Sequence, residues 1–133
     1  MPNLFSPFTL KGITLPNRIA MSPMTMYNSI DGKMDDYHVM YLGARAAGGF
    51  GLVFPEQVAI TPEGRTTTTC AGIWNDDQIE GHARVWSIIK SMGEVPGIQL
   101  GHTGRKGSEL PDQKGVNEQG SWKALGPDHP QGW

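Results

Sequence analysis

The chain has 133 residues, of which 38% are hydrophobic and 18% are charged, and its formal net charge is −2. This composition is unlike that of a disordered or a membrane protein, and the small negative charge predicts no general binding to nucleic acid or to anionic membranes. The single cysteine, Cys70, cannot form an internal disulfide, so we expect a protein of the reducing cytoplasm.

The first elements are predicted to be a hairpin and a short buried strand. Residues 8–15 alternate about Lys11-Gly12, which is typical of two strands joined by a two-residue turn. Residues 18–22 predict the next strand. It ends at Pro23 because proline has no N–H group to donate to a sheet ladder.

Two helices are predicted further along the chain. The first spans residues 36–47, and Asp35 or Asp36 can cap its amino end. The second spans residues 76–92, where Asn75–Gln78 has the pattern of a capping box and apolar side chains recur at steps of three and four.

Two short apolar runs, at residues 51–55 and 97–101, predict further strands that are covered on both faces. The order strand, helix, strand, helix, strand predicts a parallel sheet built from βαβ units. Residues 106–133 are polar and loop-like, and three parallel strands alone leave an open sheet edge. We therefore expect residues 1–133 to be one incomplete domain, the opening part of a larger α/β barrel.

Ligand-binding groups of parallel α/β folds lie at the carboxyl ends of the strands. The candidates at the three predicted strand ends are Pro23, Met24, Thr25, Met26 and Tyr27, then Glu56 and Gln57, and then Gln99 with residues 102–106. Purely structural roles stay open for most of them. The methionines could fill gaps in a core, Thr25 could satisfy its own turn, and Glu56 and Gln57 could simply be polar residues leaving a strand.

Gln99 gives a stronger signal because it lies between Ile98 and Leu100 in a strand expected to be buried on both faces. A buried amide left without hydrogen bonds costs roughly 1–3 kcal/mol. A bound ligand with matching donors and acceptors would satisfy it, so we favour a functional role for this residue.

Other polar residues give weaker signals. His102 is expected to be structural or a hydrogen-bonding neighbour, His38 packed or at the surface, and His82 facing solvent. No set of His, Cys and Asp has the spacing of metal ligands, so no metal is expected. Nothing marks Cys70 as a nucleophile, and the glycine-rich dinucleotide motif is absent.

Four separated motifs, in order along the chain, resemble the amino-terminal part of the old yellow enzymes, the FMN-dependent ene-reductases. They are "LFSPFTLKGITLPNRIAMSPM", "PEGR", "GIWNDDQIEGHARV" and "GIQLGHTGRK". The resemblance runs from about Leu4 to Lys106. "MTMY" and "GIQLGHTGRK" are most similar to the bacterial branch of the family.

The resemblance implies a (β/α)8 barrel of which this chain holds about the first three βα units, with FMN at the carboxyl ends of the strands. It implies that the segment Ser22, Pro23, Met24 and Thr25 lines the flavin and that the Thr25 hydroxyl donates toward flavin O4. Gln57 matches a position beside the ring that is often a small residue in this branch. Gln99 matches the glutamine on the pyrimidine edge, and Tyr27 an aromatic residue on the substrate side.

The implied reaction passes hydride from NAD(P)H through flavin to an activated alkene such as an enone. The residues that grip the substrate carbonyl and supply the proton come from later strands in this family, so we expect the chain alone to be inactive. Two alternatives stay open: a non-catalytic partial barrel that acts as an interaction or scaffold module, and a different flavin barrel that shares this amino-terminal half. The parent could also be a homo-oligomer.

Overall fold

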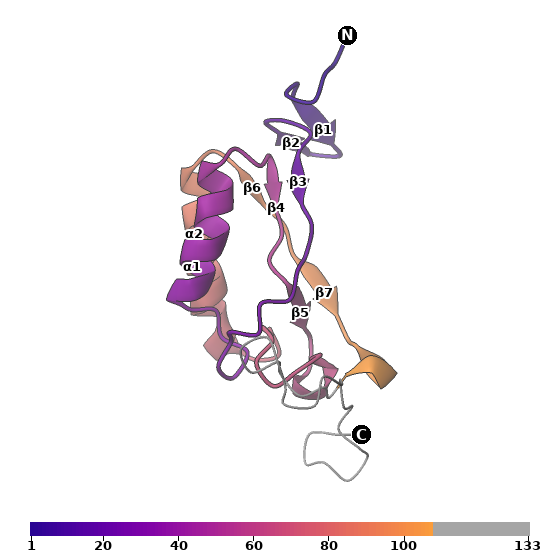
Figure 1. The fold of residues 1–133 in the computed structure, drawn as a ribbon, viewed down its shortest axis with the longest axis vertical. Coiled ribbons are helices and arrows are strands. Elements are labelled where there is room, and N and C mark those ends of the chain that lie inside the picture. Colours follow the sequence, from indigo (N-terminus) through magenta and orange to yellow (C-terminus); the bar gives the residue numbers. More distant parts are fainter. Residues whose placement is uncertain (108–133) are drawn as a thin grey trace, which may run out of the picture.

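The computed structural model describes residues 1–107 and begins with an antiparallel hairpin, β1 (Phe8–Leu10) and β2 (Ile13–Leu15). The predicted hairpin is therefore confirmed. Its left-handed turn residue is Lys11, at φ 51°, and not the glycine that follows. In Figure 1 the hairpin lies above the amino ends of the strands that follow it.

The parallel strands form a narrow layer. β3 (Ala20–Met21), β4 (Leu52–Val53) and β6 (Val95–Pro96) make one sheet in the order β3-β4-β6. Beyond it, β5 (Gln57–Ala59) pairs in parallel with β7 (Gln99–Gly101). Figure 1 shows β4 leading into β5 and β6 into β7, so the second and third predicted strands each consist of two short pieces.

A bulge separates the two pieces of the second strand. Between the paired positions Val53/Pro96 and Gln57/Gln99, three residues on the second strand oppose two on the third. One extra residue on a strand changes the direction in which the following side chains point. Val53 and Val58 therefore enter the same core although they are an odd number of residues apart.

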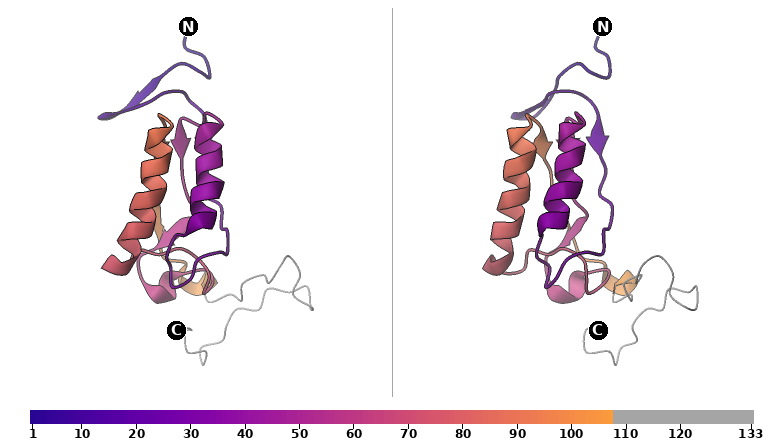
Figure 2. Two further views of the ribbon diagram at one scale, coloured as in Figure 1. Left: turned by 90° about the vertical axis from the view of Figure 1, so that its left-hand side faces the viewer. Right: turned by 60° about the vertical axis from the view of Figure 1, so that its left-hand side comes forward.

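Two helices, α1 (Asp36–Ala47) and α2 (Ile79–Ser91), pack against each other and cover one face of the strands, as Figure 2 shows. The first matches its predicted bounds. The second was predicted to start at residue 76, but residues 76–78 form a 3-10 turn, η2 (Asp76–Gln78), capped by the predicted box at Asn75. The core between helices and strands includes Met21, Leu42, Val53, Val58, Val85 and Ile89.

The face of the strands that carries Gln99 is not covered within residues 1–107, and Gln99 is exposed. The expectation that the third strand is buried on both faces is wrong for this part of the chain. Both helices lie on the opposite side, and even there Leu100 stays 57% exposed. Two further 3-10 turns, η1 (Pro62–Gly64) and η3 (Gly104–Lys106), follow β5 and β7. Most of the predicted polar loop at 106–133 lies outside the described residues. Neither described helix is long and apolar enough to cross a membrane.

Substitution of the core residue Ile89 tests this packing. Ile89 is 0% exposed and lies in the helix–strand core. We expect Ile89→Ala to lower the free energy of unfolding by about 2–5 kcal/mol and Ile89→Val by about 0.5–1.5 kcal/mol, measured by urea denaturation. Met40→Ala is the control, since Met40 is 59% exposed on α1 and should change stability by less than about 0.5 kcal/mol. Equal losses at the two positions would contradict the packing.

Candidate functional site

The structure places two of the predicted site residues side by side. Gln57 on β5 and Gln99 on β7 are partners in the parallel register, so their side chains leave the same face of the sheet. Val58, the next residue on β5, points to the opposite face of the sheet, into the core beneath the helices. Gln57 and Gln99 therefore lie on the face away from the helices, and the bulge after Val53 is what puts Gln57 there.

Ser22, Pro23, Met24 and Thr25 follow β3 in an irregular segment at the carboxyl end of that strand. Met24 and Thr25 are exposed, whereas Met26 packs against the core. The segment runs alongside the strand that contains β4 and β5, as Figures 1 and 2 show. Within residues 1–107, β3 pairs with β4 and β5 pairs with β7, so no strand pairing joins Thr25 directly to Gln99.

Tyr27 has an unusual backbone conformation. Its φ is 54°, in the left-handed region that a bulky residue rarely adopts, and its side chain is half-buried. Strain of this kind collects at functional sites, where the surrounding structure holds it in place. The observation agrees with a special role for this position but does not assign one, so the substrate-side role of Tyr27 stays a prediction.

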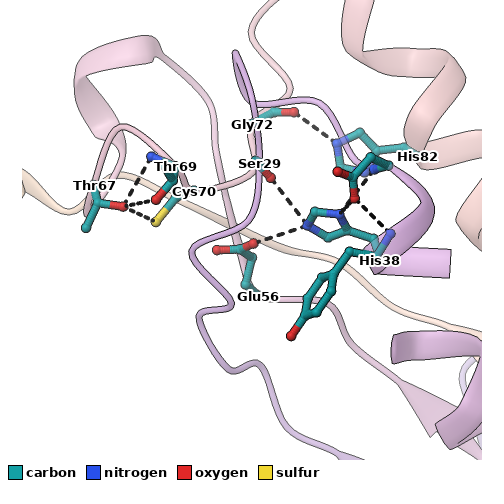
Figure 3. A network of polar contacts seen from close by, with 10 residues as sticks. Ser29, His38, Glu56, Thr67, Thr69, Cys70, Gly72 and His82 are labelled. Carbon is teal, nitrogen blue, oxygen red and sulfur yellow. Dashed lines mark hydrogen bonds and ion pairs between the residues drawn. The ribbon is translucent and has the colours of Figure 1, made fainter. Parts of the chain in front are cut away.

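A buried polar cluster surrounds His38, as Figure 3 shows. His38, near the start of α1, has Nδ1 2.9 Å from Asp35 Oδ1 and Nε2 3.3 Å from Ser29 Oγ. The same Nε2 is 3.6 Å from a carboxylate oxygen of Glu56, and both side chains are fully buried. His38 thus connects the helix cap, the segment after Tyr27 and the bulge before Gln57.

The charges in this cluster support one another. Burial disfavours the imidazolium of His38, but hydrogen bonding and charge from Glu56 and Asp35 outweigh it and raise the pKa of His38 above 6.5. For Asp35, burial opposes ionisation, yet the bonds and charge of His38 prevail and lower the pKa of that carboxyl. Asp35 and Glu56 therefore favour the protonated form of His38 against the effect of burial.

Sequence reasoning underrated this cluster. His82, expected to face solvent, is fully buried, and its Nε2–H donates to the carbonyl of Gly72 at 2.9 Å. Glu56, expected at a strand end, points into the interior and lies beside the Cys70 thiol (Figure 3). Burial, together with the Glu56 charge, raises the pKa of Cys70. Cys70 is thus a neutral thiol, in agreement with the absence of any nucleophile signal.

Two of the sequence motifs meet in space. The Thr103 hydroxyl of "GIQLGHTGRK" donates to the carbonyls of Gly64 and Arg65 in "PEGR", at 3.0 and 2.9 Å. The His102 ring packs against Gly64, where an added Cβ would lie 2.9 Å from its Cδ2. These contacts fix the turn after β5 to the turn after β7, and both turns lie at the carboxyl ends of the strands. His102 is therefore a packing neighbour, as expected.

The described residues thus form three consecutive strand units of a parallel α/β fold, with a candidate ligand face at the carboxyl ends of the strands. The NADH:flavin oxidoreductase / NADH oxidase family matches residues 3–127, and the chain belongs to this family. The predicted resemblance to the old yellow enzymes is confirmed.

Relatives and solved structures agree with this assignment. The chain is 50% identical over 105 residues to the NADPH dehydrogenase of Bacillus pumilus, covering 77% of this chain and 31% of that protein. It superimposes on morphinone reductase in complex with tetrahydroNAD with a TM-score of 0.75 at 33% identity, covering 81% of this chain and 29% of that one. For the old yellow enzyme homologue of Zymomonas mobilis the TM-score is 0.72 at 30% identity, with 78% and 29% covered. The chain therefore spans about a third of the length of its relatives.

The raised pKa of His38 predicts a pH dependence of stability. A pKa that is raised on folding gives a contribution that is complete below about pH 6.5 and is lost as pH rises through the folded pKa. We expect the free energy of unfolding, measured in urea, to fall as pH rises from about 6.5 through the raised pKa of His38. His82, whose pKa is lowered by burial, acts below this window, and Cys70, whose pKa is raised from 9.0, acts above it.

Two variants identify the group responsible for that decline. His38→Gln should remove the decline, and Glu56→Gln should move it to lower pH because the nearby negative charge is lost. A decline of the same size in His38→Gln would contradict the assignment.

Proposed function

We propose that this chain forms the amino-terminal part of an FMN-dependent oxidoreductase that uses NAD(P)H to reduce an activated alkene, such as an enone, in the cytoplasm. The observation that carries the proposal is the registered pair Gln57 and Gln99 on the face away from the helices, next to the segment that follows β3. Family membership adds the expectation of flavin and nicotinamide chemistry.

The residues on this face fit the polar edge of a flavin ring. An amide side chain offers both a donor and an acceptor, which suits a pyrimidine edge that alternates N–H and carbonyl groups. FMN, when bound, would accept hydride from NAD(P)H and deliver it to the alkene.

In this proposal, Gln99, the segment after β3 and Tyr27 each have a separate role. Gln99 binds the pyrimidine edge, and the Ser22–Thr25 segment lines the ring. The Thr25 hydroxyl, exposed at the carboxyl end of β3, donates toward the carbonyl that gains charge on reduction and so stabilises the reduced state. Tyr27 forms a wall on the substrate side. Glu56 and His38 support these residues from behind without touching a ligand.

A hybrid protein tests the proposal, because the chain spans 31% of the Bacillus pumilus relative. Residues 1–107 would replace the corresponding segment of that NADPH dehydrogenase. We expect the hybrid to bind FMN and to oxidise NADPH with 2-cyclohexenone. Gln99→Leu should weaken FMN binding roughly tenfold, measured by flavin fluorescence, because the ring edge loses hydrogen bonds.

Ser87→Ala, on the exposed side of α2, is the control for this experiment and should leave FMN affinity unchanged. A correctly folded hybrid that holds no flavin would refute the proposal, and so would one in which Gln99→Leu binds FMN as tightly as the parent hybrid.

A second candidate is the interaction module, favoured by apolar side chains that stay uncovered on the strands and hairpin. Leu10, Ile13 and Leu100 are between 56% and 58% exposed. Exposed apolar surface of this kind marks contact sites. Sedimentation of the 133-residue chain with and without FMN separates the two candidates. A discrete oligomer without flavin supports the module, whereas we expect a monomer that binds FMN weakly at most and turns over no enone.

A further inference from the structure

Gln57 occupies space that a side chain at position 101 would need. A Cβ added to Gly101 would lie 2.6 Å from Gln57 Cδ and 2.8 Å from Gln57 Cγ, and its nearest neighbour would be Gln57 Nε2. Real Cβ atoms essentially never come this close to another heavy atom. Gly101 does not have a positive φ, so the backbone conformation does not demand glycine. The space over Gly101 is instead filled by the flexible, half-buried side chain of Gln57, which would have to move aside for a Cβ.

The Gln57 amide extends along the site face toward the carboxyl ends of the strands. Gln99 and Gly101 are two residues apart on β7 and share a face, and Gln57 is in register with Gln99. A side chain that starts opposite Gln99 and ends over Gly101 crosses between the strands, which are about 4.8 Å apart. The amide of Gln57 therefore lies closer than Gln99 to the carboxyl ends of the strands, where the ligand pockets of barrels open.

We propose that Gln57, seated over Gly101, is a specificity-determining residue that presents a polar wall to the substrate. This inference rests on the proposed function. Gln99 already serves the ring edge, so the second amide faces a molecule that lies on the flavin. It favours alkenes that carry a hydrogen-bonding substituent over apolar analogues of the same shape, because an apolar group would leave the amide unpaired.

The steric part of the proposal is tested on the 133-residue chain itself, without FMN. Gly101→Ala, Gln57→Ala and the double variant form a double-mutant cycle, and the quantity measured for each is the urea concentration at the midpoint of unfolding. We expect Gly101→Ala to lower the midpoint more when Gln57 is present, because its side chain must then move aside, than when residue 57 is alanine. Gly12→Ala is the matched control, since a Cβ at Gly12 meets no atom within 4 Å, and it should show no coupling to Gln57. Additive effects of Gly101→Ala and Gln57→Ala would overturn the seating.

The specificity part is tested in the hybrid enzyme. The measurement is the ratio of kcat/KM for a cyclic enone bearing a hydroxymethyl group to that for its ethyl analogue. We expect Gln57→Leu to lower this ratio about five- to tenfold, as the loss of one hydrogen bond implies. Gly101→Ala should lower it in the same direction by displacing the amide, while Gly12→Ala leaves it unchanged.

The outcomes separate the two proposals. FMN binding and turnover with an unchanged ratio in Gln57→Leu would overturn the specificity role and leave the proposed function intact. A hybrid without flavin would overturn the proposed function and the specificity role together, and the unfolding cycle would still decide whether Gln57 is seated over Gly101.

Discussion

The buried contact between Glu56 and His38 is the interaction on which the rest of this structure depends. A carboxyl group inside a protein needs a polar or charged partner, and here His38 Nε2 lies 3.6 Å from Glu56 Oε1, with both side chains fully buried. The contact lies within the bulge of the second strand, so it helps to hold the extra residue that turns Gln57 toward the site face. Through Ser29, the same histidine also holds the segment that follows Tyr27. One buried polar contact thus joins a helix end to two parts of the candidate site.

The two faces of the strands serve different purposes. The helix-side face is filled by aliphatic side chains such as Val53, Val58 and Ile89, which supply the apolar burial. The opposite face carries Gln57 and Gln99, together with a glycine that leaves room for an amide. Such a division is suited to binding, since polar groups that are not consumed by the core stay available to a ligand. The exposure of Gln99 therefore agrees with a ligand-facing position, although it contradicts burial on both faces.

Sequence patterns predicted helices and turns well where the determining residues are close together in the chain. The helix at 36–47 follows from its cap and composition, and the hairpin from its alternation about a turn. Patterns failed where burial depends on distant partners. His82 has polar and small neighbours in the sequence, yet it is buried because Gly72, ten residues earlier, accepts its N–H. The roles of Thr25, Tyr27 and Gln99 in binding came from family resemblance and remain predictions.

By itself, the sequence determined the order of strands and helices, the parallel class of fold and the family, because caps, turns and motifs are encoded by neighbouring residues. Only the tertiary structure decided the direction of Glu56 and Gln57 and which side chain fills the space over Gly101. The physical cause is register. A single extra residue between two paired positions reverses the faces of a strand, and it becomes visible only when the neighbouring strand is in place.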